Sequence, residues 1–247
     1  MTADVSFRLN GETVSVPAEG SLLDAVRDRL GDTSVKDGCS PQGQCGACTV
    51  LVNGEARVSC VTSITRVANA DVTTVEGLDP ATRDQWVAAF ESTGAAQCGF
   101  CTPGILCRLV STAARRGLSD VAIERALAAH LCRCTGWQPI VEAATLLRDG
   151  GEFAPRDPHL ATVRAGIEQG VPQTAGPDVV LGRAPYADDT ADGAAFNQKQ
   201  GEELLAMVVE AAGDTAVVAE DLGVVPDYVP ASLERLKIPG YKIPHFL

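Results

Sequence analysis

The chain has 247 residues, of which 45% are apolar and 21% are charged, as is ordinary for a soluble globular protein. Its formal net charge of −12 at pH 7 argues against nucleic acid and anionic membrane surfaces as partners. No apolar run reaches the roughly eighteen residues of a membrane helix, so no membrane span is predicted. The N-terminus lacks the basic and apolar regions of a secretory signal, which predicts a cytoplasmic protein.

The first predicted elements, between residues 4 and 76, form a small mixed unit of strands and one helix. Apolar and polar residues alternate on both sides of Asn10-Gly11, a pair that favours a two-residue hairpin turn. Ser21 stands three residues before Asp24, which is the spacing of a helix-capping pair. Apolar residues at helical spacing follow, so we predict a hairpin and then a helix.

A second hairpin is predicted further along this unit, over residues 49–52 and 55–59. Its turn is the pair Asn53-Gly54. Counting the strand register outward from that turn places Cys60 opposite Ala47 and so beside Cys48. Strand pairing is therefore expected to bring together two cysteines that lie far apart in the sequence.

A glycine-rich loop between the predicted helix and the second hairpin carries three cysteines, and the end of the hairpin supplies a fourth. Their spacing is C-x5-C-x2-C-x11-C, one residue longer in its first gap than the C-x4-C-x2-C run of a plant-type [2Fe–2S] protein. The loop glycines would let backbone N–H groups turn toward the sulfurs. We therefore predict a [2Fe–2S] cluster with four thiolate ligands, Cys39, Cys45, Cys48 and Cys60.

Helical patterns replace strand patterns over residues 77–150. Thr102, which precedes a proline, is predicted to cap one helix. Ser119 is predicted to cap another, which continues through an apolar stripe into Cys132. A last helix is expected over about residues 139–148, so this part of the chain should be a helical bundle.

Four more cysteines lie at the ends of these predicted helices, two before one helix and two after another. Their spacing is C-x2-C-x30-C-x-C, and four soft sulfur ligands are enough to complete one metal centre. We predict a second [2Fe–2S] cluster, with ligands Cys98, Cys101, Cys132 and Cys134. Outside both sets, Cys107 is expected to be a buried apolar residue and His130 to lie on a polar face.

Zinc is the alternative metal for both sets, in which case the protein would be a zinc-binding interaction module without redox activity. Structural zinc ligands usually come as two C-x2–4-C pairs. In the first set the fourth thiol stands alone at the end of a strand, and in the second set the C-x-C pair is tighter than zinc sites prefer. The spacings therefore favour iron–sulfur clusters.

The sequences around these cysteines resemble one known family. The motifs are QCGACTV at 44–50, QCGFCTPG at 97–104 and CRCTG at 132–136. Over residues 4 to about 155 the chain is similar to the small iron–sulfur subunit of the molybdenum hydroxylases, the xanthine dehydrogenase and aerobic carbon monoxide dehydrogenase group. Many relatives have four residues between the first two cysteines where this chain has five, so the loop there is expected to be slightly wider.

The resemblance implies a fold, cofactors and partners. It implies an α+β architecture, in which a β-grasp ferredoxin-like domain is followed by an all-α four-helix bundle, each with a [2Fe–2S] cluster. The helical-domain cluster would lie nearest the molybdopterin of a large partner subunit, and Gln97 matches the family glutamine that hydrogen-bonds the pterin. The ferredoxin-domain cluster would pass electrons toward a subunit that carries FAD. The chain itself would have no substrate site and no catalytic residue.

The C-terminal part has a different character. Many prolines, glycines and aspartates predict a linker or an extended arm, and helical and strand patterns return near residue 202. The last 45 or so residues separately resemble a fragment of 4-alpha-glucanotransferases, in which the residue matching Glu220 is the general acid/base. Glycoside chemistry needs a second, opposed carboxylate, and that motif is absent, so we expect Glu220 to be catalytically silent.

Four segments follow from these patterns. They are the ferredoxin-like domain, the helical domain, the linker or arm and a C-terminal segment of uncertain fold, over residues 1–76, 77–155, 156–200 and 201–247.

Overall fold

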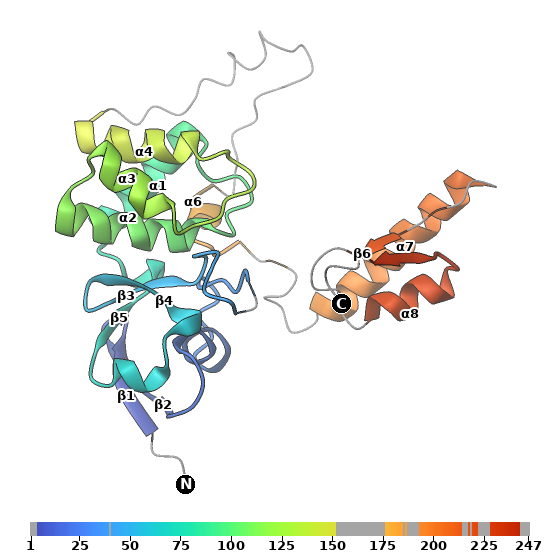
Figure 1. Ribbon diagram of the computed structural model, residues 1–247, viewed down its shortest axis with the longest axis horizontal. Coiled ribbons are helices and arrows are strands. Elements are labelled where there is room, and N and C mark those ends of the chain that lie inside the picture. The colour runs from blue at the N-terminus through green and yellow to red at the C-terminus, as the bar shows by residue number, and fades with distance from the viewer. Residues whose placement is uncertain are drawn as a thin grey trace. The chain divides into compact units, whose positions relative to one another are not determined.

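The computed structural model describes residues 4–39, 41–151, 176–184, 186, 193–213, 217, 219–221 and 228–242. The chain divides into two compact units, Met1–Ala184 and Pro185–Leu247. Both helices and strands occur in each unit (Figure 1). In the first unit, a small sheet lies at one end and a group of helices at the other.

The sheet of the first unit has five strands in the order β2-β1-β5-β3-β4 (Figure 1). β1 and β5 are parallel, whereas the other neighbouring pairs are antiparallel. One face of the sheet packs on a core that includes Phe7, Leu22 and Ile64. The strands are β1 (Asp4–Leu9), β2 (Glu12–Pro17), β3 (Thr49–Val52), β4 (Glu55–Val58) and β5 (Asp71–Thr73).

Both predicted hairpins are confirmed. Leu9 pairs with Glu12 across the first turn and Val52 with Glu55 across the second. The φ angles of the two turn residues are positive in both hairpins, 51° and 92° in the first and 49° and 76° in the second. Asn-Gly pairs favour this type I′ geometry because asparagine tolerates a positive φ and glycine adopts it without strain.

The predicted capping pair is also confirmed, but the helix that follows is wider than an α-helix. The backbone N–H of Ser21 donates to Asp24 Oδ2 at 2.8 Å, and the Asp24 N–H donates to Ser21 Oγ at 3.2 Å. The π-helix η1 (Asp24–Arg29) follows, and the N–H of Leu30 reaches back five residues to the carbonyl of Ala25. The periodic apolar pattern predicts a helix but does not distinguish these two windings.

The helical part of this unit is made of α-helices over the region where helical patterns were predicted. α2 lies against the β3–β4 hairpin, where the Ser111 hydroxyl donates to the carbonyl of Gly54 at 2.9 Å and accepts from the N–H of Ala56 at 3.1 Å. The α-helices are α1 (Pro80–Thr93), α2 (Thr102–Arg116), α3 (Asp120–Leu127), α4 (Gln138–Asp149) and α6 (Gly176–Val180). The short 3₁₀ turns are η2 (Ser59–Val61), η3 (Ile64–Val67) and η4 (Val75–Gly77).

Two predicted helix ends differ from the structure. Thr102 is the first residue of α2, whose N-cap is Cys101, and not the cap itself. The helix expected to run into Cys132 ends at Leu127, because the N–H of His130 closes a short turn to the Leu127 carbonyl at 2.9 Å. Ser119, in contrast, caps α3 as predicted and accepts from the N–H of Ala122 at 3.3 Å.

Residues 176–184, within the predicted linker or arm, pack on the helical part. Val179, Val180 and Leu181 are buried in the same core as α1 and α2. The guanidinium of Arg183 holds the carboxylate of Glu76 through two bonds, Nε to Oε1 at 2.6 Å and Nη2 to Oε2 at 2.5 Å. This pair joins the segment to η4.

We expect Arg183→Gln to loosen residues 176–184. An exposed but bidentate ion pair stabilises by up to about 1 kcal/mol, so amide hydrogen exchange in this segment should become about fivefold faster. Hydrogen-exchange mass spectrometry measures this directly. Arg8→Gln is the matched control, since it breaks the Arg8–Asp71 pair on the sheet and should leave residues 176–184 unchanged. Equal exchange in Arg183→Gln and the unaltered protein would contradict the expectation.

In the second unit, the described residues form two helices and a two-stranded parallel sheet. Glu202, on α7, accepts from Ser232 Oγ at 2.6 Å and from Arg235 Nη2 at 2.7 Å, which ties α7 to α8. α7 begins before residue 201, where the C-terminal segment was expected to start. Apolar residues over 216–219 are part of the strand pattern expected in this segment; residue 219 belongs to β6, and residues 216 and 218 lie outside the described residues. The elements are α7 (Gly193–Ala212), β6 (Ala219–Asp221), α8 (Tyr228–Arg235) and β7 (Gly240–Lys242).

None of the helices in the described part of the chain combines the length and the apolar character needed to cross a membrane.

Candidate metal centres

The first set of cysteines gathers in the sheet unit. Cys39 and Cys45 lie in the loop after η1, Cys48 lies just before β3, and Cys60 lies in η2 directly after β4. The predicted register is confirmed at this end of the hairpin, where the Ser59 N–H and hydroxyl both donate to the Cys48 carbonyl, at 3.3 and 2.7 Å. Cys45, Cys48 and Cys60 are buried and Cys39 is half-buried.

The four thiols of this set interact as two pairs. The thiol of Cys39 lies close enough to that of Cys45 to raise its pKa, and the thiol of Cys48 likewise raises the pKa of Cys60. Charge interactions also link the pairs, since Cys48 acts on Cys45 and Cys39 acts on Cys60. The set is therefore one cluster of sulfur atoms with two closer couples inside it.

Backbone N–H groups point at the sulfurs in this loop. Burial raises the pKa of the Cys39 thiol, but N–H groups of Cys45, Gln44 and Gln42 outweigh burial and lower the pKa to about 7. The Gln42 N–H donates to Cys39 Sγ at 3.3 Å. Burial and the neighbouring Cys48 raise the pKa of Cys60 to about 12. Cys60 would therefore become a thiolate only when a metal ion takes the place of its proton.

The second set gathers where the helical part meets the sheet unit. Cys98 and Cys101 precede α2, while Cys132 and Cys134 lie between α3 and α4. Two pairs recur here: the thiol of Cys134 raises the pKa of Cys98, and that of Cys132 raises the pKa of Cys101. Cys101 is buried, whereas Cys98 and Cys134 are exposed.

The inner pair of the second set has unequal thiols. Burial, and then the proximity of Cys132, raises the pKa of Cys101. Burial also acts to raise the pKa of Cys132, but hydrogen bonds from the side chain and backbone of Thr135 and the backbone of Cys134 lower it overall. The Thr135 hydroxyl lies 3.1 Å from Cys132 Sγ. Cys132 is therefore the thiol of this pair that loses its proton more readily.

The pairing of the thiols fits a diiron core better than a single ion. In a [2Fe–2S] core held by four cysteines, each iron takes two thiolates, so two couples per set are what the core needs. A structural zinc ion would draw four sulfurs around one point. Two neighbouring couples of thiols in each set are consistent with the iron–sulfur interpretation.

The two sets are in direct backbone contact. The N–H of Leu131, next to Cys132, donates to the carbonyl of Cys45 at 2.9 Å. Gly104, in the first turn of α2, has no room for a side chain: a Cβ there would lie 2.4 Å from the Gly46 carbonyl oxygen and 2.6 Å from that of Ala47. The backbone of the loop that carries Cys45 and Cys48 therefore packs directly against the first turn of α2, which follows Cys101.

His130 lies in this contact and corrects the prediction of a polar face. Its side chain is 2% exposed, and burial together with the nearby Arg108 guanidinium lowers its pKa to about 3. Nε2 accepts from Arg108 Nε at 3.3 Å, while Nδ1 has no hydrogen-bond partner in the described structure. A Cβ on Gly46 would lie 2.5 Å from Nδ1. The sequence did not reveal this placement, because it depends on a loop from the sheet unit packing over the helical part.

Two further residues singled out in the sequence are Cys107 and Gln97. Cys107 is buried in the helical core. Burial raises its pKa to about 12, as suits a small apolar residue. Gln97 is exposed in the loop before α2, directly beside the exposed Cys98. Its side chain is therefore at the surface where the second set opens.

Comparison with known proteins gives two adjoining family matches. A model described as 2Fe-2S iron-sulfur cluster binding domain matches residues 7–74, and one described as [2Fe-2S] binding domain matches residues 74–145. A third model, 4-alpha-glucanotransferase, matches residues 123–247. It overlaps the second over residues 123–145, which carry two of the thiols described above. It is a minor and spurious match that assigns no activity to this chain.

Individual relatives cover the same part of the chain. Isoquinoline 1-oxidoreductase subunit alpha from Brevundimonas diminuta is 39% identical over 55% of this chain and 91% of its own length. Aldehyde oxidoreductase from Megalodesulfovibrio gigas is 42% identical over 53% of this chain, and the match spans only 15% of that longer protein. The crystal structure of aldehyde oxidoreductase from Desulfovibrio desulfuricans ATCC 27774 matches 77% of this chain and 22% of its own, with 30% identity and a TM-score of 0.62.

Proposed function

Because the chain belongs to the family of small iron–sulfur subunits of the molybdenum hydroxylases, we propose that it relays electrons through two [2Fe–2S] clusters. The electrons would come from a molybdopterin site on a partner subunit and leave toward FAD or another acceptor. The chain is in this sense the electron-transfer part of an oxidoreductase, and the substrate would be oxidised elsewhere.

The ligands that we propose are the two sets of thiols. One iron of the first cluster would take Cys39 and Cys45 and the other Cys48 and Cys60, following the observed couples. In the second cluster the couples are Cys98 with Cys134 and Cys101 with Cys132. When bound, each cluster supplies a one-electron redox centre, which thiol side chains alone do not provide. The backbone N–H groups that point at Cys39 would stabilise added negative charge and so raise the potential of the first cluster.

The observation that carries this proposal is the contact between the two sets. From the Cys45 carbonyl a single hydrogen bond of 2.9 Å leads to the N–H of Leu131, and the next residue is Cys132. This covalent and hydrogen-bonded path joins a proposed ligand of one cluster to a proposed ligand of the other. Two structural metal sites would have no need of such a path, whereas a relay does.

Other details rest on the family. We propose that the sheet unit is a β-grasp domain over residues 1–76 and the helical part a four-helix bundle over residues 77–155. The second cluster would then face the large molybdopterin-binding subunit, and the exposed side chain of Gln97 would contact the pterin. An FAD-binding subunit would contact the part of the chain that holds the first cluster. The assembly would be cytoplasmic. The exposure of Gln97 and Cys98 supports this orientation.

Electron paramagnetic resonance tests the proposed relay. With both clusters reduced by dithionite, two S = 1/2 signals are expected, and at low temperature each should be split by the other, because the loops that hold them touch. Power and temperature series on the purified protein measure this splitting. Cys101→Ser is the control, since it removes the second cluster and should leave an unsplit first signal. Two signals without mutual splitting would contradict the proposed relay.

A further inference from the structure

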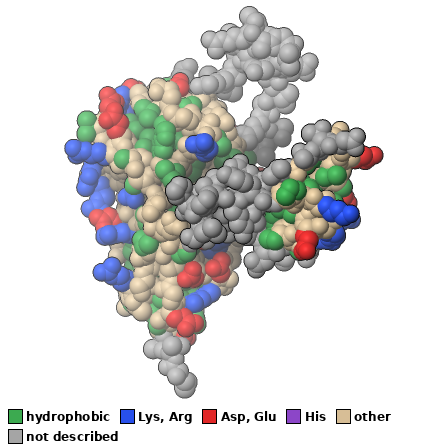
Figure 2. Space-filling view, turned by 45° about the vertical axis from the view of Figure 1, so that its right-hand side comes forward, with side chains coloured by type: hydrophobic (Ala, Val, Ile, Leu, Met, Phe, Trp, Pro, Cys, Tyr) green, Lys and Arg blue, Asp and Glu red, His purple; other side chains and the backbone are tan. Residues whose placement is uncertain are grey.

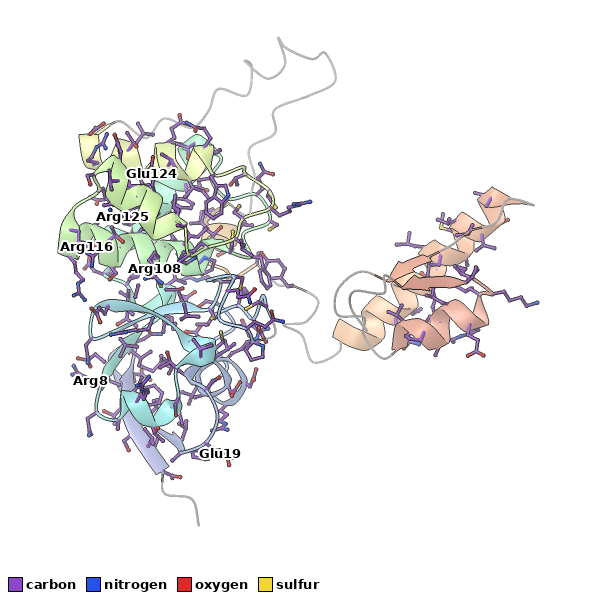
Figure 3. The ribbon with its side chains drawn as sticks, in the orientation of Figure 1. Arg8, Glu19, Arg108, Arg116, Glu124 and Arg125 are labelled. Atoms are coloured by element: carbon purple, nitrogen blue, oxygen red, sulfur yellow. The ribbon has the colours of Figure 1, made fainter. Side chains whose placement is uncertain are left out.

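A hollow of about 450 Å³ opens between β4 and the helices α2 and α3, and none of the eight thiols lines it. Its walls carry five arginines in a chain whose net charge is −12. Figure 3 labels three of them on α2 and α3, and Figure 2 shows Lys and Arg side chains gathered along the left-hand edge of the molecule. The five are Arg57, Arg108, Arg115, Arg116 and Arg125.

Carboxylates in the lining compensate only part of the positive charge of these five arginines. The single carboxylate that lines the hollow, Glu55, is shared by Arg57 at 2.5 Å and by Arg115. Within the part of the chain that the structure describes, Arg116 and Arg125 are exposed and form no ion pair. Glu124, the neighbour of Arg125, does not line the hollow. Five guanidinium groups thus surround one space with one carboxylate between them.

Arg108 forms the inner end of the hollow and is the least hydrated of the five. Its Nε donates to Nε2 of the buried His130 at 3.3 Å, and a histidine brings no negative charge. Burial and the like charge of Arg57 both lower the pKa of Arg108, which means that its cation is not compensated by the protein. Its terminal nitrogens have no acceptor among the described residues. A half-buried guanidinium without a counter-ion is a strong anion ligand.

The part of the wall that comes from α3 is largely apolar, apart from Arg125. It includes Val121, whose side chain is 55% exposed, together with Ala122 and Ala126. The hollow therefore offers a charged half and an apolar half, and its volume lies in the range of small-ligand sites.

We infer that this hollow binds an organic phosphate of nucleotide size, with its phosphates against the arginines and its organic body against α3. Planar guanidinium groups bind phosphate oxygens through two parallel bonds, which favours phosphate over a single carboxylate. None of the residues that line the hollow belongs to either set of thiols, and Arg108 alone of the five arginines contacts His130 beside the cysteine loop.

Calorimetric titration of the full chain, with its clusters in place, tests the inference with two probes, ADP and inorganic diphosphate. We expect ADP to bind at one site and more tightly than diphosphate, since only ADP reaches the wall of α3. The double variant Arg116→Gln/Arg125→Gln should weaken ADP binding at least about tenfold, because each side chain supplies a charge-assisted bond and neither holds a protein partner.

Arg66→Gln is the matched control, since Arg66 is exposed, forms no ion pair in the described structure and does not line the hollow. It should leave ADP binding unchanged. No saturable binding of ADP at millimolar concentration would overturn the inference. Binding of diphosphate as tight as that of ADP, or an equal loss in Arg66→Gln, would also overturn it.

Discussion

Replacing Cys48 with serine is expected to remove one of two [2Fe–2S] signals and about half of the iron from the purified protein. Cys48 is 1% exposed and couples to Cys60, so no other thiol can take its place without moving the β3–β4 hairpin. A serine hydroxyl does not ionise near neutral pH and is a poor ligand for iron. Dithionite-reduced EPR spectra and an iron assay on anaerobically purified protein measure both effects.

Cys107→Ser is the matched control for this experiment. Cys107 is also 1% exposed, but it lies within α2 and belongs to neither set of thiols. A serine there can bond its hydroxyl to a carbonyl one turn back in the helix, so the fold should tolerate it. Both signals and all of the iron should remain. Retention of both signals in Cys48→Ser, or loss of one in Cys107→Ser, would show that the ligands are misassigned.

The second large effect is expected when Gly104 is replaced by alanine, because the first turn of α2 touches the loop of the first set of cysteines there. An alanine Cβ would lie 2.4 Å from the carbonyl oxygen of Gly46 and 2.6 Å from that of Ala47. These are backbone atoms of the cysteine loop, so neither can rotate away. Gly104→Ala should lower the free energy of unfolding by about 3 kcal/mol, as overpacking typically does, and should weaken the splitting between the two EPR signals.

The sign of this effect distinguishes packing from helix propensity. Within a helix, alanine normally stabilises the fold by about 1 kcal/mol relative to glycine. Gly201→Ala is the control, because Gly201 lies in α7 and a Cβ there meets nothing within 4 Å. Urea unfolding of the cluster-containing proteins should show Gly201→Ala unchanged or slightly stabilised. An equally stable Gly104→Ala protein would mean that the contact between the loops is not tight.

What the sequence could predict was mostly local. Asn10-Gly11 and Asn53-Gly54 specify their turns through the backbone conformations that these residues favour, and the register counted from the second turn led correctly to Cys60 beside Cys48. The cysteine spacings likewise indicated two sets, because short intervals in a chain restrict where its thiols can be.

What could not be predicted depends on contacts between distant segments. His130 is buried because the loop at Gly46 covers it, and nothing in its neighbourhood in the sequence indicates that loop. The end of α3 at Leu127 follows in part from the bond between the Leu131 N–H and Cys45. The arginine-lined hollow draws its residues from β4, α2 and α3, so its charge is visible only after folding.

The most direct test of the electron relay is the content of iron and acid-labile sulfide in protein purified without oxygen. Two [2Fe–2S] clusters predict about four irons and about four sulfides per chain, with no stoichiometric zinc. A colourless protein that contains zinc and lacks labile sulfide would contradict the account.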